Sequence, residues 1–251
     1  MRSSSSHWQC KFLPLFSLFL LALSAPVLAI DADNDGLPDD WEIANGRDPL
    51  VADYRVAAGY DHTCALDDTG VVCWGYNENG QTTVPSLNNP IRVSGGSVHS
   101  CALNDTGVVC WGSNQYGQTT VPSLANPTQV SAGRNHTCAL DDTGVVCWGS
   151  NYSGQTTVPA LANPTQVSGG YEHTCAVDDT GVVCWGSNSH GQTTVPSLAN
   201  PTQVVGREVH SCALDDTGVV CWGSNRWGQT TVPSLTNPIQ VSVGYDHTCA
   251  L

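Results

Sequence analysis

Positive charge is scarce in this sequence. Its 251 residues include 8 lysines and arginines against 22 aspartates and glutamates. Arg2 and Lys11 lie in the first thirty residues, which contain no acid, so the remainder has 6 arginines, no lysine and 22 acids, a formal charge of −16. Such a surface repels phosphate backbones and anionic lipids. The charge balance therefore argues against nucleic-acid binding and favours cations, or partners with basic patches, as ligands.

Long apolar runs are also lacking, apart from Phe12–Ala25 near the N-terminus. This run follows Arg2 and Lys11, and residues 27–29 supply small side chains at the positions that a signal peptidase reads. We therefore predict a signal peptide over residues 1–29 and a secreted, periplasmic or cell-surface protein with no membrane insertion after cleavage. An uncleaved membrane anchor is the alternative, which the short run and the prolines in and after it disfavour.

Catalytic motifs are missing too. The sequence contains no nucleophile elbow, no spacing of zinc ligands and no phosphate-binding loop, and no segment shows a helical period. We therefore expect a protein that is not an enzyme.

A repeat dominates what remains. The motif Val-Cys-Trp-Gly recurs with its cysteine at 73, 110, 147, 184 and 221, and His-Thr/Ser-Cys-Ala recurs with its cysteine at 64, 101, 138, 175, 212 and 249. Both series advance by 37 residues, which gives five full copies and the start of a sixth over residues 55–251. Self-similarity at a period of this size is typical of solenoids and propellers.

Each copy has the pattern of a short β meander. In residues 134–170, His-Thr-Cys-Ala-Leu predicts a brief strand, Asp-Asp-Thr-Gly a turn, and Val-Val-Cys-Trp-Gly the returning strand. A Gln-Thr-Thr-Val-Pro segment, a loop ending in Asn-Pro and a further strand follow. Units of three or four strands at this length favour an all-β protein, a β-propeller of 37-residue blades. A β-solenoid is the alternative, but its coils are usually shorter.

The motifs resemble a known repeat. Ala-Gly-x-x-His-Thr-Cys-Ala-Leu, Asp-x-Gly-x-Val and Cys-Trp-Gly-x-Asn-x-x-Gly-Gln are similar to the regulator of chromosome condensation repeat. The Gly-Gln-Thr-Thr-Val-Pro continuation resembles its bacterial secreted branch, which includes the propeller-type beta-lactamase inhibitor protein. The resemblance implies a propeller. Its eukaryotic members are guanine nucleotide exchange factors, but the signal peptide and the acidic charge argue against that activity here.

One copy departs from the pattern. The others carry glycine immediately before the two residues that precede the histidine, as at Gly133 and Gly170. In the fifth copy Arg207 takes this position and Gly206 comes one residue earlier. We expect this loop to bend differently.

The cysteines predict disulfides, because regularly spaced cysteines in an exported protein are usually oxidised. Folding at the Asp-Thr turn brings the two cysteines of a copy together, which predicts the pairs 64–73, 101–110, 138–147, 175–184 and 212–221: Cys64, Cys73, Cys101, Cys110, Cys138, Cys147, Cys175, Cys184, Cys212 and Cys221. Buried free thiols and bridges between blades, such as 73–101, are alternatives. Cys249 is left over, and its partner would fall at position 258. We expect an incomplete ring, from a truncated sequence or from a final half-blade that closes against the start.

An acidic segment follows the predicted cleavage site. Residues 31–42 fit the twelve-residue calcium loop D-x-D-x-D-G-x5-E, in which hard oxygen ligands select Ca²⁺. The expected structural Ca²⁺ site has the ligands Asp31, Asp33, Asp35, Leu37 (through its carbonyl), Asp39 and Glu42. With a short helix to about residue 45 it would form a segment over 30–54 that resembles the lone loops of thrombospondin type 3 and EF-hand-like repeats. An acidic linker is the alternative.

Two dipeptides vary most between copies, and both should lie at the end of the blades opposite the Asp-Asp-Thr-Gly turn. One precedes the histidine and the other precedes Gly-Gln. Because tyrosine, tryptophan and arginine anchor interfaces, we predict partner contacts there. Neutral drift in exposed loops is the alternative. The predicted contact residues are Tyr60, Asp61, Glu78, Gln115, Tyr116, Arg134, Tyr152, Tyr171, Glu172, His190, Glu208, Arg226 and Trp227.

The recurrent histidines and tryptophans are a different matter. One histidine per copy at a fixed register (62, 99, 136, 173, 210 and 247) indicates a structural side chain that bonds the neighbouring loop. The tryptophans at 74, 111, 148, 185 and 222 indicate packing between blades.

The sequence therefore predicts an exported binding module that recognises a protein, peptide or glycan through one propeller face. A structural or adhesive module of a longer surface protein is the first alternative. A propeller enzyme, such as a lyase or hydrolase, is the second.

Overall fold

The computed structural model describes residues 55–67 and 69–251. These residues belong to the second of two compact units, Ala52–Leu251. The described part is all-β, with seventeen strands and no helix, and so it has no helix that could cross a membrane. The predicted signal peptide and the predicted calcium segment lie outside the described residues.

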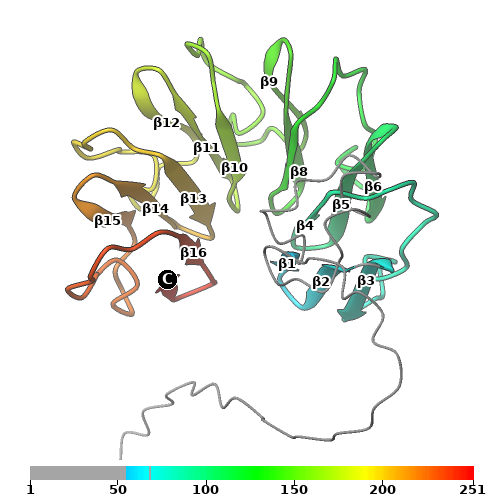
Figure 1. Cartoon of the computed structure of the whole chain (residues 1–251), viewed down its shortest axis with the longest axis horizontal. Coiled ribbons are helices and arrows are strands. Elements are labelled where there is room, and N and C mark those ends of the chain that lie inside the picture. The colour runs from blue at the N-terminus through cyan, green and yellow to red at the C-terminus, as the bar shows by residue number, and fades with distance from the viewer. Residues whose placement is uncertain (1–54, 68) are drawn as a thin grey trace, which may run out of the picture. The chain divides into compact units, whose positions relative to one another are not determined.

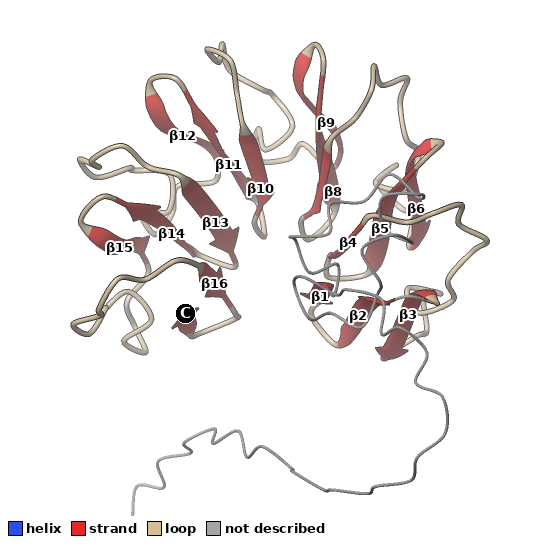
Figure 2. Ribbon diagram, in the orientation of Figure 1, coloured by secondary structure: helices blue, strands red, loops and turns tan. Residues whose placement is uncertain are grey.

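Each of the first five repeats forms one three-stranded antiparallel sheet, here called blades 1 to 5, and the sixth forms a two-stranded sheet, half-blade 6 (Figures 1 and 2). Their strands are β1 (Arg55–Ala58), β2 (His62–Asp67) and β3 (Gly70–Gly75); β4 (Arg92–Gly95), β5 (His99–Asn104) and β6 (Gly107–Gly112); β7 (Gln129–Ala132), β8 (His136–Asp141) and β9 (Gly144–Gly149); β10 (Gln166–Gly169), β11 (His173–Asp178) and β12 (Gly181–Gly186); β13 (Gln203–Arg207), β14 (His210–Asp215) and β15 (Gly218–Gly223); and β16 (Val241–Val243) with β17 (Thr248–Ala250).

The hairpin of each blade is closed by a side chain. In blade 3, Asp141 Oδ1 accepts hydrogen bonds from the backbone N–H of Thr143 at 2.8 Å and from its hydroxyl at 2.7 Å. Gly144 follows with a φ of 114°, in a region that glycine enters without steric cost. This turn sets the register that pairs Cys138 with Cys147.

The blades are arranged around a centre. The first strand of each blade, from β1 through β4, β7, β10 and β13 to β16, faces that centre and contacts the first strand of the next blade (Figure 1). The apolar core is divided into clusters between consecutive sheets. One of them contains Val177 from blade 4 with Val204 and Trp222 from blade 5, all at most 8% exposed. Because each sheet buries its faces against its neighbours, the repeats stabilise one another. The described residues form a β-propeller, as the sequence predicts.

The fifth repeat has the expected different bend. A Cβ at Gly170 would collide with the His173 ring, so a side chain cannot replace this glycine without a backbone change. Where Arg207 takes the position, strand β13 is one residue longer, and Arg207 pairs directly with His210. Glu208 then begins a two-residue turn with a φ of 37°.

Candidate functional site

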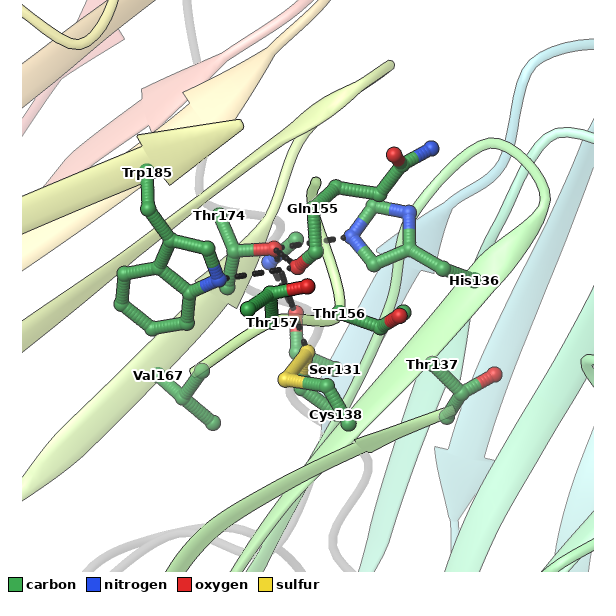
Figure 3. The surroundings of a disulfide bond; sticks show 12 residues. Ser131, His136, Thr137, Cys138, Gln155, Thr156, Thr157, Val167, Thr174 and Trp185 are labelled. Carbon is green, nitrogen blue, oxygen red and sulfur yellow. Dashed lines mark hydrogen bonds between the residues drawn. A yellow bond between two sulfur atoms is a disulfide. The ribbon is translucent and has the colours of Figure 1, made fainter. Parts of the chain in front are cut away.

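The joint between adjacent blades is a polar cluster (Figure 3). The carbonyl oxygen of Gln155 accepts two hydrogen bonds, one from the hydroxyl of Thr174 and one from Nε1 of Trp185, both at 2.9 Å. His136 Nε2 lies 3.0 Å from the same Thr174 hydroxyl. Since that hydroxyl gives its only proton to Gln155, the imidazole must donate from Nε2 and leave Nδ1 without a proton.

The same joint recurs around the propeller. His62, His99, His173 and His210 each lie within 3.2 Å of a serine or threonine hydroxyl in the following blade. Burial in the joint lowers the pKa of His99, His136 and His173 to about 3, so these rings are neutral at physiological pH. The recurrent histidines therefore connect blades, which is the structural role expected from their regular spacing.

The tryptophans complete the joint. Trp111, Trp148, Trp185 and Trp222 are 8–9% exposed, and each donates its Nε1 proton to the glutamine carbonyl of the preceding repeat. Trp74 in blade 1 is 52% exposed, because no described repeat precedes it. The Gln-Thr-Thr-Val-Pro segment is thus the loop on which the next blade rests, not a fourth strand.

The cysteines of each blade face each other across the hairpin. In all five predicted pairs the sulfur atoms lie 2.06–2.10 Å apart, which is disulfide distance. The structure pairs cysteines within blades and not between them. Cys249 in half-blade 6 is exposed and has no disulfide partner among the described residues.

The calcium ligands predicted at residues 31–42 lie outside the described residues. Within residues 55–67 and 69–251, no group of three or more His, Cys, Asp or Glu side chains has an arrangement that could hold a metal ion.

The first variable dipeptide of each copy lies next to the centre of the propeller. The backbone N–H of Tyr60 donates to the carbonyl of Gly96 at 3.1 Å, and that of Arg134 donates to Gly170 at 3.1 Å. These bonds join the first strand of one blade to that of the next. They hold the variable side chains in a circle, here called the inner circle.

The second variable dipeptide lies at the same end. The N–H of Tyr76, which follows β3, donates to the carbonyl of Asp61 at 2.8 Å. The hydroxyl of Ser153 in the loop after β9 donates to Glu172 Oε2 in the next blade at 3.1 Å. The two sets of loops are therefore neighbours, and the Asp-Thr-Gly turns close the opposite ends of the same hairpins.

Six variable side chains form one continuous strip across this end of blades 2 to 4. Its outer part is an edge-to-face pair of tyrosine rings with centroids 5.9 Å apart. Its inner part is an arginine that lies 3.6 Å from a glutamate and 3.9 Å from the centroid of a tyrosine ring. The serine–glutamate hydrogen bond joins the two parts. In order, the strip contains Tyr116, Tyr152, Ser153, Glu172, Arg134 and Tyr171.

The strip is built for contact more than for stability. Both partners of the Arg134–Glu172 ion pair are more than a third exposed, and such pairs contribute little to the free energy of unfolding. Tyr152 is 85% exposed, although apolar rings of this size are normally covered. Rigid aromatic rings and arginine side chains that are already fixed in place lose little entropy when a partner binds.

The remaining predicted contact residues occupy other parts of the same end. Tyr60 packs against Tyr245 of half-blade 6 with centroids 5.5 Å apart. The others are exposed and have no contact with the strip: Asp61, Glu78, Gln115, His190, Arg226 and Trp227. Of these, Glu78 accepts a hydrogen bond from Tyr76, and Arg226 lies over the Trp227 ring at 5.1 Å from its centroid.

Glu208 differs from the other predicted contact residues. Its side chain is only 8% exposed, and burial raises the pKa of its carboxyl to about 7. It lines a small hollow at the centre of the inner circle together with residues from the ends of β4, β7 and β10.

Sequence reasoning missed three residues of this end. Ser153 bridges the two variable sets, but small polar side chains give no signal of binding in one sequence. Arg207 reaches across the centre, where its Nη1 donates to the Ala58 carbonyl at 2.8 Å. Its departure from glycine was the available signal. Tyr245 meets Tyr60 only because the sixth repeat lies close to the first.

A ring of three-stranded sheets with invariant joints and one variable end defines the class: a β-propeller repeat protein. The sequence matches the family model of the regulator of chromosome condensation (RCC1) repeat at residues 55–81, 91–118, 128–155 and 165–192. These segments are therefore RCC1 repeats, and the resemblance predicted from the motifs is confirmed at this level. No curated protein sequence matches the chain significantly.

Solved structures share the fold. Human WBSCR16 superposes with a TM-score of 0.67 at 22% identity, covering 79% of this chain and 73% of that one. Prp20p from Saccharomyces cerevisiae, whose binding to Gsp1p and histones was examined, gives 0.61 at 20% identity over 71% and 58% of the two chains. The ectodomain of the Arabidopsis thaliana receptor kinase ACR4 gives 0.56 at 26% identity over 68% and 65%. The chain thus spans less than two thirds of the latter two.

Proposed function

We propose that this chain is an exported, non-catalytic binding module that recognises a protein, peptide or glycan through the variable end of its propeller. The continuous strip from Tyr116 to Tyr171 carries this proposal. Repeats that are almost identical elsewhere place their differences side by side on one surface, and the differing side chains are of the types that dominate binding energies.

Two further observations support the proposal. The related structure of Prp20p is described by its binding to other proteins, and ACR4 contributes an ectodomain. The cysteine pairs at disulfide distance suit an oxidising compartment. A catalytic site normally breaks the symmetry of a repeat, whereas the buried histidines here repeat with the blades and are occupied in the joints.

Removing the exposed anchors should abolish capture of a partner. The variant with alanine at Tyr116, Tyr152, Arg226 and Trp227 should retain at most about a tenth of the capture from the secreted fraction of the source cells, since hot-spot truncations cost 2 kcal/mol or more. The matched control carries alanine at Asp142, Asp179 and Asp216, on the turns at the opposite end, and should capture as the wild type does. Equal capture by the four-alanine variant would reject the variable end as the binding surface.

We place a structural Ca²⁺ at residues 31–42, with the ligands Asp31, Asp33, Asp35, Leu37, Asp39 and Glu42. The oxygen-donor spacing supports this assignment, and the ion would stiffen the segment ahead of the propeller. Calorimetric titration of the mature protein with CaCl₂ should show one site, with a Kd on the order of 10⁻⁴ M as in extracellular modules. The variant Glu42→Gln should weaken it at least about tenfold, because the bidentate ligand is lost. Heat of binding that is equal in both proteins would assign the Ca²⁺ to another site.

A further inference from the structure

The centre of the inner circle holds a small hollow. It has a volume of about 10 Å³, which is room for one water-sized group. Four consecutive blades contribute to its lining: Gly96, Ser97, Ala132, Gly133, Arg134, Gly169, Gly170, Tyr171, Arg207 and Glu208. Most of these are glycines and small residues, so backbone forms much of the wall.

Glu208 is the acidic group of this hollow. Its side chain is 92% buried, yet among the described residues its carboxylate has neither a hydrogen-bond donor nor an ion-pair partner within bonding distance. An isolated carboxylate in such surroundings is costly to keep charged. Burial accordingly raises the pKa of Glu208 to about 7.

The backbone at Glu208 is strained as well. Its φ of 37° lies in the left-handed region, where the other described non-glycine residues are all asparagines. Asparagine tolerates this region, whereas glutamate does so at a cost. The tight turn that follows from Arg207 therefore holds the Glu208 carboxyl at the hollow.

The charges around the hollow leave it net negative. Arg134 is paired with Glu172, and Arg207 donates to the Ala58 carbonyl, so both cations already have partners. Asp246 lies close enough to raise the pKa of Glu208 further, and the negative charge of Glu208 is the main cause that raises the pKa of Tyr245. An incoming cation would be the missing partner of Glu208.

We propose that the hollow accepts the primary ammonium group of a lysine side chain from the bound partner, with Glu208 as its ion-pair partner. This inference rests on the proposed function and names the chemistry of its ligand. The volume suits an ammonium group and is too small for a planar guanidinium. The formal charge of −16 outside the first thirty residues steers basic partners toward the protein.

The assignment also gives a direction for the pH dependence. Binding of an ammonium group requires the carboxylate form of Glu208, so affinity should rise between pH 6 and pH 8. The other charged groups that act on this carboxyl are Arg207, Arg134 and Asp246. None of them changes charge in that range, because two are arginines and the third is an aspartate.

Carboxyl-detected NMR of protein labelled with ¹³C-glutamate tests the inference directly. The probe is the peptide acetyl-Gly-Gly-Lys-Gly-Gly-amide, and the Glu208 signal is assigned by its absence in Glu208→Gln. The lysine peptide should shift this signal in a saturable way and lower the apparent pKa of Glu208. Glu208→Gln should bind the peptide at least about tenfold more weakly. The control Asp216→Asn, at the opposite end of blade 5, should bind as the wild type does.

Three matched probes complete the experiment: the Nε-acetyllysine peptide, the arginine peptide and CaCl₂ alone. None should shift the Glu208 signal at concentrations that saturate the lysine peptide. An equal response to acetyllysine, a stronger response to arginine, a response to Ca²⁺ alone, or undiminished binding by Glu208→Gln would each overturn the assignment. Failure here leaves the four-alanine capture result standing, because that variant does not touch Glu208.

Discussion

Acidification from pH 7 to pH 5 should destabilise the propeller by about 6 kcal/mol through three histidines alone. His99, His136 and His173 are completely buried, and burial lowers their pKa from the ordinary 6.5 to about 3. The native state therefore keeps them neutral at pH 5, whereas the unfolded chain protonates them. At one pKa unit per 1.36 kcal/mol, each ring contributes about 2 kcal/mol at that pH.

The sign follows from the direction of the pKa shifts. A histidine whose pKa is lowered by folding has no effect above pH 6.5, where both states are neutral. Its cost grows as the pH falls through the window between 6.5 and 3 and is constant below it. His62 and His210, whose pKa values are also lowered by burial, act in the same direction. Glu208 acts in the opposite direction because its pKa is raised, but it is one group against five.

Urea unfolding followed by tryptophan fluorescence at several pH values measures this effect. The free energy of unfolding should fall by at least about 4 kcal/mol per pH unit between pH 6 and pH 5. His136→Gln keeps a donor near the Thr174 hydroxyl but cannot titrate, so its slope should be smaller by about 1.4 kcal/mol per pH unit. The control His247→Gln, at an exposed ring, should keep the full slope. A free energy that is flat over this range would contradict the buried neutral joints.

Reduction of the cysteine pairs should abolish the folded state. Each pair joins residues nine apart in sequence, and closing so short a loop contributes about 2.5 kcal/mol in the loop-entropy model, or roughly 13 kcal/mol for five. This equals or exceeds the whole free energy of unfolding of a typical domain, which is about 5–15 kcal/mol. The sheets are only three strands wide and their strands are short, so little else compensates.

Circular dichroism and urea unfolding of the reduced, alkylated protein provide the measurement. The cooperative transition of the oxidised protein should disappear on reduction. The single-pair variant Cys138→Ala with Cys147→Ala should still fold and lose about 2–3 kcal/mol. Mass mapping without reduction should find one alkylated cysteine in the described residues, Cys249. Alkylation of all their cysteines without reduction, or an unchanged urea midpoint after it, would show that the pairs are free thiols.

These two predictions concern the parts of the repeat that sequence reasoning could place. The pairing of Cys138 with Cys147 needs only a hairpin and its Asp-Thr-Gly turn, so local pattern was enough. The propeller followed from the 37-residue period in the same way. The bend in blade 5 could be foreseen because Arg207 takes a glycine position that leaves no room for a side chain.

The remaining features depend on contacts that no local pattern contains. The joint brings His136, Gln155, Thr174 and Trp185 together from two repeats, with partners 19 to 38 residues apart in sequence. A single sequence shows that these residues recur but not that they share one hydrogen-bond network. The strip is the same case, since Ser153 has no significance until Glu172 lies beside it.

The division between joints and variable end explains how one fold can hold its shape while its surface differs from blade to blade. The joints use side chains that are the same in every repeat, so substitutions at the variable end leave them intact. Tyr116 and Tyr152 can differ from their counterparts in other blades because they contact each other and solvent, not the joint.

The most direct test of this account is hydrogen exchange of the protein with and without a captured partner. The account predicts that protection gained on binding is confined to the loops that contain the two variable dipeptides, strongest around Tyr116, Tyr152 and Glu172. The Asp-Thr-Gly turns at the opposite end should exchange at the same rate in both samples. Protection of those turns, with unchanged exchange at the variable loops, would contradict it.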